Sequence, residues 1–265
     1  MRISLGSHLV IAATLATVAC SDGAGPRGTA PVSLALSTRP APVGPPAGSA
    51  ISASLQSGVP ETFTDGTNTL VISSVELVLR EVELKRVEET DCGTPGDDAC
   101  EEFETGPILL DLPLGGGTER VFTTNIAAGT YDEVEFELHK PEDDGNAVDR
   151  DFLLAHPDFA RISVRARGTF NGADFTYTSD LNADQELPLA PPLVVSEGAA
   201  TALTLRVDLS GWFLSGGTLV DPRTANKGGA NENLVRDSII RSFDGFRDND
   251  EDGLDDDHED SDGGH

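Results

Sequence analysis

The residues whose types and spacing could do chemistry lie in the stretch RDNDEDGLDDDHED, residues 247–260. From Asp248 onward, acidic side chains occupy the first, third, fifth, ninth and twelfth positions of a twelve-residue loop, and glycine occupies the sixth. Carboxylates at this spacing can wrap a hard cation, glycine permits the sharp turn, and the next residue offers its carbonyl. The stretch therefore predicts a calcium site with the ligands Asp248, Asp250, Asp252, Leu254, Asp256 and Glu259.

Asp255 stands where a paired EF-hand has an apolar branched residue, which argues against a switching helix pair. The loop instead resembles those of thrombospondin type 3 repeats and other extracellular calcium modules, in one copy. The resemblance implies a structural ion with a Kd of about 10⁻⁴ to 10⁻³ M. The alternative is a solvated acidic run without any ion.

Two histidines of the predicted body, His139 and His156, are the candidate catalytic bases. His156 has Asp151 and Asp158 nearby, which could form an acid–base pair, although a histidine before proline is more often exposed or capping. His139 precedes KPEDDGN, whose acids Glu142, Asp143 and Asp144 fit no ligand spacing and are interpreted as a turn.

Nucleophile, zinc-protease, P-loop and dinucleotide motifs do not occur in the sequence. We therefore predict a protein that is not an enzyme. The alternative is a hydrolase acting on extracellular glycan, because two separated carboxylates carry no local signature.

The first segment is typical of an export signal. Arg2 precedes the apolar run LVIAATLATVA, which is too short to span a bilayer, and residues 1–19 are predicted to be a signal peptide. The stretch ATVACSD resembles the site at which bacterial lipoproteins are cleaved and acylated, which implies lipidation of Cys20 and attachment to a membrane. Secretory cleavage beside a chance cysteine, or an uncleaved anchor, are the alternatives.

Cys92 and Cys100 bracket a short loop, DCGTPGDDAC, and export would place them in an oxidising compartment. We predict a disulfide between them, with zinc as the competing interpretation. The formal charge of −28, from 46 acidic and 18 basic residues, excludes nucleic acid as a natural partner and suits divalent cations or basic partners.

The elements that must position these groups are mainly strands. Residues 20–50 are predicted to be a tether with a possible first strand at 31–38, followed by a β-sandwich at 51–245 and the acidic tail at 246–265. Apolar residues recur at spacing two between turn residues, which is typical of an antiparallel β-sandwich of immunoglobulin or transthyretin type. Strands are expected within the runs PILLDLPL, RVFTTNI, YDEVEFELH, ARISVRARGTF, DFTYTSDL and TALTLRVDL.

Four local signals refine this sandwich. In ISSVELVLREVELKRVEE the apolar residues change phase, so a bulge near Arg80 and Glu81 would keep both sets inward, with a helix as the alternative. Asn171 and Gly172 predict a type I′ hairpin. LGGG at 114–117 is interpreted as a hairpin tip, and Trp212 as a core plug or a lid on the sheet end.

One C-terminal helix is expected at about residues 232–243. Val235, Ile239, Phe243 and Phe246 would share one face, Asn231 or Asn233 would cap the start, and Gly245 would stop the helix. This helix should dock on the sandwich and present the acidic tail.

PILLDLPL, followed by IAAGTYDEVEFEL, LRVDLSGWF, Asp221–Pro222 and a final SF before an Asp-rich end, resembles a widespread family of bacterial lipoproteins known only as a domain of unknown function. The resemblance implies an exported β-sandwich and supplies no reaction. We expect a lipid-anchored protein of the cell envelope, facing the periplasm or the exterior, with a structural or binding role and an envelope protein or glycan as partner.

Overall fold

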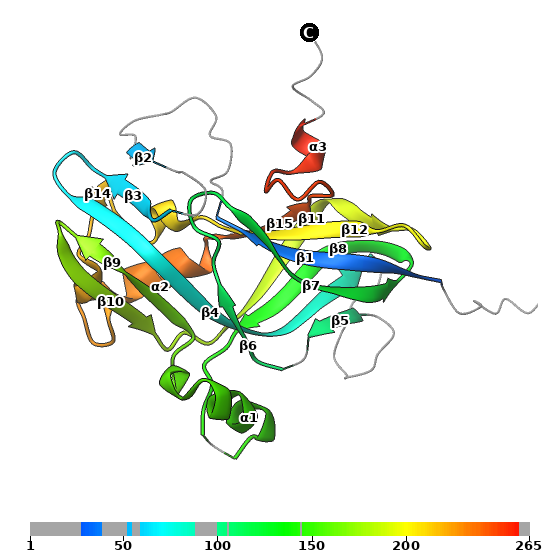
Figure 1. The fold of residues 1–265 in the computed structure, drawn as a ribbon, viewed down its shortest axis with the longest axis horizontal. Coiled ribbons are helices and arrows are strands. Elements are labelled where there is room, and N and C mark those ends of the chain that lie inside the picture. Colours follow the sequence, from blue (N-terminus) through cyan, green and yellow to red (C-terminus); the bar gives the residue numbers. More distant parts are fainter. Residues whose placement is uncertain are drawn as a thin grey trace, which may run out of the picture.

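The computed structural model describes residues 28–38, 52–54, 59–87, 100–104, 106–143 and 145–259. The fold is all-β and sandwich-like, as the alternating pattern predicts (Figure 1). One sheet has four strands in the order β15 (Phe243–Arg247), β12 (Thr201–Val207), β1 (Thr29–Ser37) and β7 (Thr118–Ala127).

The second sheet has nine strands and is built around β4 (Thr69–Arg86), which has 18 residues. Its main path runs through β10 (Ala173–Ser179), β9 (Val164–Phe170), β4, β3 (Glu61–Thr64) and β2 (Ser52–Ser54). β4 also pairs with β5 (Cys100–Glu104), β6 (Ile108–Asp111) and β8 (Gly129–Leu138), and β8 pairs with β11 (Ala183–Val195).

Short elements complete the chain. β13 (Leu214–Ser215) and β14 (Thr218–Leu219) form a separate hairpin. The helices are α1 (Ala147–Ala155), α2 (Glu232–Ile240) and α3 (Asp256–Glu259), with 3-10 turns η1 (Pro157–Phe159), η2 (Leu209–Gly211) and η3 (Pro222–Ala225). α1 and α3 lie on opposite sides of the body (Figure 1).

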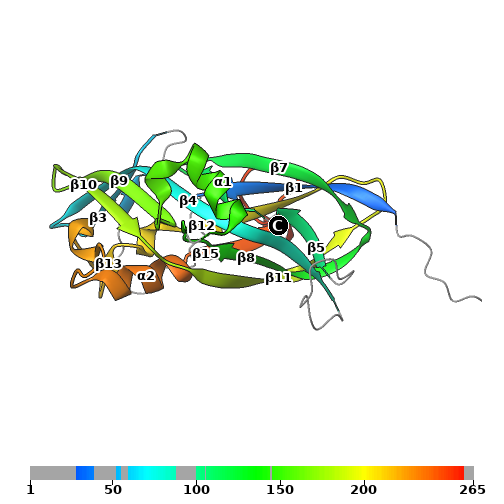
Figure 2. The same cartoon turned by 90° about the horizontal axis from the view of Figure 1, so that it is seen from below.

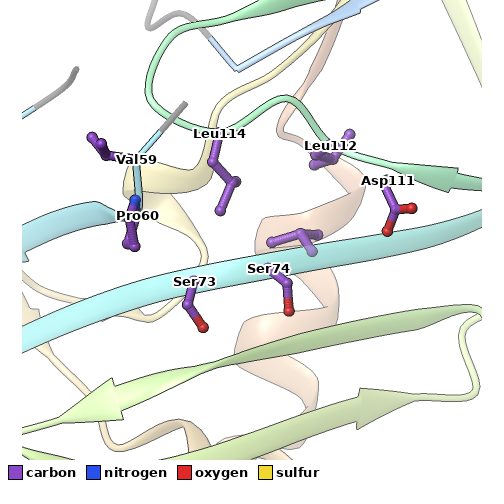
Figure 3. Close-up of a pocket in the computed structure, with 8 residues that line it drawn as sticks. Val59, Pro60, Ser73, Ser74, Asp111, Leu112 and Leu114 are labelled. Atoms are coloured by element: carbon purple, nitrogen blue, oxygen red, sulfur yellow. The ribbon is translucent and has the colours of Figure 1, made fainter. Parts of the chain in front are cut away.

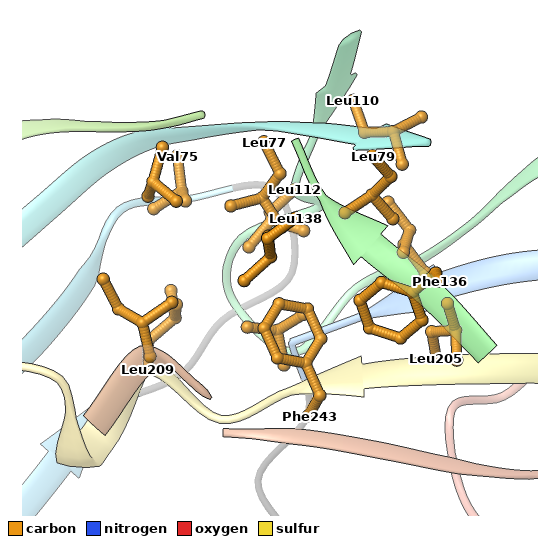
Figure 4. Packing of buried hydrophobic residues seen from close by; sticks show 14 of the residues in the cluster. Val75, Leu77, Leu79, Leu110, Leu112, Phe136, Leu138, Leu205, Leu209 and Phe243 are labelled. Carbon is orange, nitrogen blue, oxygen red and sulfur yellow. The ribbon is translucent and has the colours of Figure 1, made fainter. Parts of the chain in front are cut away.

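The core lies between the two sheets. Figure 2 shows β1 and β7 in one layer and β8 and β11 in the other. Leu77 of β4, Phe136 of β8, Leu205 of β12 and Phe243 of β15 meet in one buried cluster (Figure 4). Trp212 is fully buried in the same cluster, which confirms its interpretation as a core plug.

β4 confirms both the strand and the bulge predicted from its sequence. The pairing with β8 shifts register between Arg80 and Glu83, and Glu81 has a φ of 53°. Because the bulge changes the phase of the strand, apolar residues on both sides of it are buried in the core: Val75, Leu77, Leu79, Val82 and Leu84. The helix alternative for this segment is wrong.

The hairpin between β9 and β10 is also confirmed, because Asn171 and Gly172 both have positive φ, at 52° and 79°. The turn at residues 114–116 is not a hairpin tip, however. It connects β6, which pairs with β4, to β7, which pairs with β1 in the other sheet. The glycines therefore allow the chain to cross between layers.

The C-terminal helix is shorter than predicted. α2 ends at Ile240, and its buried residues Val235 and Ile239 belong to the core. Phe243 and Phe246 lie in β15, which pairs with β12, so the strand and not the helix leads into the acidic loop. Gly245 does not stop the helix, because it lies within β15 opposite Leu205.

Two further features were not predicted. α1, capped by the Asn146 side chain accepting the Val148 N–H at 3.0 Å, is an additional helix in the crossover between β8 and β9. β1 is an interior strand, parallel to β12 and antiparallel to β7. The segment at 31–38 expected as a first or edge strand thus lies inside the body.

Candidate metal centre in the C-terminal loop

Asp248 begins the loop directly after β15 and is fully buried. Its N–H donates to Ala202 O at 3.1 Å, which continues the pairing with β12 for one more residue. Its Oδ2 accepts the Thr204 hydroxyl at 2.8 Å and the Gly253 N–H at 3.0 Å, and its Oδ1 accepts the Asp252 N–H at 3.0 Å. Burial raises the pKa of this carboxyl, although these hydrogen bonds oppose the rise.

Three of the predicted ligands converge. One carboxylate oxygen from each of Asp248, Asp250 and Asp256 lies within 4.8 Å of the other two. Calcium takes its oxygen ligands at about 2.3–2.6 Å, so oxygens on one coordination sphere are separated by at most roughly 5 Å. The spacing of these three carboxylates therefore fits one such ion. Asp248 is buried and Asp250 is exposed, so the group opens toward solvent on one side.

The other predicted ligands have different positions. Asp252 Oδ1 accepts the Leu254 N–H at 2.8 Å, which caps the turn, and Asp252 does not join the converging group. Leu254 is half-buried in the same turn. Glu259 lies in α3, and its side chain is outside the described residues.

The loop packs on the side of the four-stranded sheet that faces away from the core. Along β12, Leu203 and Leu205 point into the core, so Ala202 and Thr204 point to the opposite face, where the loop lies. Asn249 Oδ1 accepts the Ala202 N–H at 3.2 Å, and the Asn249 amide donates to Asp256 Oδ2 at 2.8 Å. Asn249 thus ties one candidate ligand to the sheet.

Glu251 and Gly253 fix the loop over β1 and β7. Glu251 Oε1 accepts the Arg120 Nε–H at 2.8 Å and the Ser33 hydroxyl at 3.3 Å. Gly253 has a φ of +84°, and a Cβ at this position would lie 2.5 Å from Thr118 Oγ1 and 2.7 Å from Ser37 Oγ. Glycine is therefore required here both for the turn and for the close approach to the sheet.

Positive charge next to the loop comes from Arg120 and Arg247. Arg247 pairs with Asp257, and its Nε lies 3.7 Å from Asp256 Oδ2. These cations face many more carboxylates, which include Asp248, Asp250, Glu251, Asp252, Asp255, Asp256 and Asp257. The loop therefore carries an excess of negative charge that a divalent cation would reduce.

The two histidines considered as candidate bases have defined contacts in the structure. His139 is buried, with Nε2 2.8 Å from Asp149 Oδ1 and Nδ1 3.5 Å from Glu137 Oε2, so both ring nitrogens face carboxylates. His156 follows α1 and packs on Phe152, with ring centroids 4.8 Å apart. Asp158 pairs with Arg165 at 2.6 Å.

In the acidic turn after His139, Glu142 has two basic neighbours. Glu142 Oε1 lies 2.6 Å from Lys140 Nζ and 3.4 Å from Arg161 Nη2. Asp143 is exposed, and Asp144 is outside the described residues. Glu142 is therefore held in ion pairs.

Two surface hollows among the described residues are places where a glycan-acting site could be sought. One, of about 230 Å³, lies between residues 59–60, β4 and the end of β6, and it is lined by Asp111, Ser73 and Ser74 among others (Figure 3). The other, of about 320 Å³, contains Asp174 and Arg167. A glycosidase needs two carboxyl groups flanking the scissile bond, and each hollow is lined by a single one.

The side chains predicted to carry the lipid and to form the disulfide lie outside the described part of the structure. Cys20 and Cys92 lie outside the described residues, and for Cys100 the structure describes the backbone at the start of β5. No helix in the described ranges is both long enough and apolar enough to cross a bilayer.

Comparison with known proteins gives no relative: no family model, curated protein or solved structure matches the chain.

Proposed function

We propose that this protein is an exported, lipid-anchored β-sandwich of the cell envelope with a structural or binding role, and that its C-terminal loop binds one calcium ion. The observation that carries the calcium proposal is the convergence of Asp248, Asp250 and Asp256 in a loop attached to three strands. Leu254 and Glu259 are the further ligands that the sequence pattern suggests.

The ion would act on the loop and not on a substrate. Ca²⁺ prefers carboxylate and carbonyl oxygens, which are the donors that these positions supply. A bound ion would offset the repulsion among the loop carboxylates and strengthen the attachment of the loop to β12, since Asp248 already bonds to Thr204. Its role would therefore be structural.

Calorimetric titration of calcium into the metal-stripped chain from residue 21 onward tests this proposal. We expect saturable binding of one ion with a Kd of about 10⁻⁴ to 10⁻³ M. Asp250→Asn should weaken binding at least about tenfold, because one charged ligand is lost at an exposed position where folding is not disturbed. Asp184→Asn, at an exposed site on β11, is the matched control and should bind as the wild type does.

Thermal unfolding gives a second readout. Calcium at ten times its Kd should stabilise the folded protein by about 1.4 kcal/mol, and magnesium at the same concentration should do less. Absence of both heat and stabilisation at 10 mM calcium, a level on the order of ten times the weakest expected Kd, would contradict the calcium proposal and leave the loop as an acidic segment docked on the sheet without an ion.

The anchor is tested separately. Mass spectrometry of the mature N-terminus should find a diacylglyceryl group on Cys20, because the residues before it resemble a lipoprotein cleavage site, with Thr17 where that site usually has leucine. An unmodified terminus at another residue would remove the anchor from the proposal without affecting the calcium loop.

The disulfide also has its own test. Peptide mapping without reductant should recover Cys92 and Cys100 in one cross-linked fragment, as the export of the chain implies. Free thiols at both positions would contradict it.

A further inference from the structure

A buried group of charged side chains joins α1 to the nine-stranded sheet, far from the acidic loop. His139 follows β8 directly, and its ring lies between Asp149 of α1 and Glu137 of β8. The exposed fractions of these three residues are 5%, 3% and 5%. Charged residues are almost never buried to this extent unless they are paired, so the group has a specific reason to be here.

Every element around the ring contributes a charge or a polar group. Arg80 of β4 places Nη2 2.5 Å from Glu137 Oε2, and the Asn182 amide donates to Glu137 Oε1 at 2.6 Å. Asp149 Oδ2 accepts the Glu142 N–H at 2.9 Å. Arg80 also pairs with the exposed Glu81, with Nε 3.1 Å from Oε1. Within the buried group, the charges of Arg80 and protonated His139 cancel those of Glu137 and Asp149. With the ring neutral, one carboxylate charge has no counter-ion within the group, which is costly in a buried site.

The other contacts of the α1–η1 segment, residues 146–162, centre on a small apolar cluster. Phe152 and Phe159 form a small cluster with Val78 of β4, separate from the main core. Arg165 of β9 lies 4.0 Å from the centre of the Phe159 ring and pairs with Asp158. Leu154 is 78% exposed. Leu109, Leu153 and Ile162 also pack on this cluster, so the segment is attached to the body both by a small apolar cluster and by the buried charges.

We propose that His139 is an ionic latch: its imidazolium holds the α1–η1 segment against β4 and β8, and loss of the proton releases that segment while the sandwich stays folded. The latch is a conformational device that responds to alkaline pH. Release would expose the apolar side chains of Phe152, Phe159 and Val78, which are buried in the closed form.

The direction of the response follows from the surroundings of the ring. Burial favours the neutral ring, but Glu137 and Asp149 outweigh it and raise the pKa of His139 above its ordinary value. A raised folded-state pKa means that the stabilisation is fully present below about pH 6.5, the value for an unfolded chain, and is lost as pH rises through the folded-state pKa. The segment should therefore loosen on the alkaline side.

Hydrogen–deuterium exchange of the α1 amides between pH 6 and pH 9 tests the latch in the full chain. After correction for the intrinsic rise in exchange with pH, protection of residues 147–155 should fall about tenfold for each unit by which the folded-state pKa exceeds the ordinary one, while β12 stays protected. Asp149→Asn removes one of the two flanking charges, so the loss should occur at lower pH.

His156→Gln is the matched control, because His156 lies on the same segment and packs on Phe152. Unlike His139, it has no ion pair with a described carboxylate. It should leave the pH profile unchanged. An NMR titration of the His139 ring in the wild type needs no substitution and covers the case in which a variant fails to fold. A His139 pKa at or below 6.5, or α1 protection that follows that of β12 across the range, would overturn the proposal.

Discussion

At the scale of single residues, the Asp248 carboxylate serves both as a candidate metal ligand and as a hydrogen-bond acceptor within the loop. It is the buried member of the converging carboxylates, and it also accepts hydrogen bonds from Thr204, Asp252 and Gly253. A buried carboxylate is costly unless such donors satisfy it. The same side chain therefore organises the turn in the absence of any ion.

Asp248→Ala should consequently destabilise the protein even in calcium-free buffer. Removing the carboxylate leaves the fully buried Thr204 hydroxyl without this acceptor, and we expect a loss of about 1–3 kcal/mol in the free energy of unfolding. Urea denaturation measures it. Asp250→Ala, at an exposed position of the same loop, should change stability by no more than about 0.5 kcal/mol. Equal effects of both substitutions would show that the buried hydrogen bonds contribute little.

Glu76 gives a pH dependence of the opposite sign to that of His139. Arg165 donates to both Glu76 oxygens, at 2.6 and 2.5 Å, and this contact lowers the pKa of the Glu76 carboxyl. A lowered folded-state pKa means that the stabilisation is present above the unfolded value, about 4.3, and is lost as pH falls through the folded-state pKa.

Glu76→Gln should therefore flatten the stability profile below about pH 5. At pH 7 it should cost about 1–3 kcal/mol, since the buried Arg165 loses one ionic partner and keeps Asp158. Denaturant unfolding at several pH values measures both effects, with the exposed Glu186→Gln as the control on the same sheet. A profile for Glu76→Gln that parallels the wild type would contradict this account.

At the scale of elements, the acidic loop and the four-stranded sheet form one unit. The loop contacts β12 through Asp248 and Asn249, and β1 and β7 through Glu251. This arrangement covers the outward face of strands whose other face is in the core. The loop is therefore expected to unfold together with the sheet rather than independently.

Two glycines allow this docking to be measured. Gly253 and Gly66 have nearly the same φ, +84° and +87°, but a Cβ at Gly253 would collide with Ser37 and Thr118, whereas a Cβ at Gly66 meets nothing within 4 Å. Gly66→Ala should cost roughly 1 kcal/mol for its backbone conformation alone. Gly253→Ala should cost more, because the loop must also move away from the sheet. Unfolding curves of the two variants compare them directly, and equal losses would argue against tight docking.

At the scale of the whole molecule, β1 connects the N-terminal part of the chain to its C-terminal part. Its neighbours are β12 on one side and β7 on the other, and Val32, Leu34 and Leu36 are buried in the core. Because an interior strand supplies hydrogen bonds on both edges, its removal would leave two unpaired edges and a cavity between the sheets.

A chain that begins at Gly28 should therefore fold, and a chain that begins at Arg39 should not. Circular dichroism and the dispersion of amide NMR signals distinguish the two outcomes. A folded protein lacking residues 28–38 would show that β1 is dispensable, as a tether would be.

The sequence by itself determined the features that depend on neighbouring residues. Alternation identified β1, β4, β6 to β10 and β12 and placed the bulge at Arg80 and Glu81, and Asn171–Gly172 fixed a hairpin, because backbone conformation and side-chain period are local properties. It missed β11, whose sequence ADQELPLAPPLVV contains three prolines. The spacing of the aspartates likewise identified the loop, and Asp248, Asp250 and Asp256 do converge.

Only the tertiary structure decided which distant segments meet. Phe243 and Phe246, three residues apart, fit one face of a helix, but β12 offers hydrogen bonds that draw them into β15, where they point to opposite sides. The parallel pairing of β1 with β12 and the burial of His139 beside Asp149 also join residues from separate elements. Local pattern cannot predict such contacts, because their stability comes from hydrogen bonds and burial that exist only after the chain has folded.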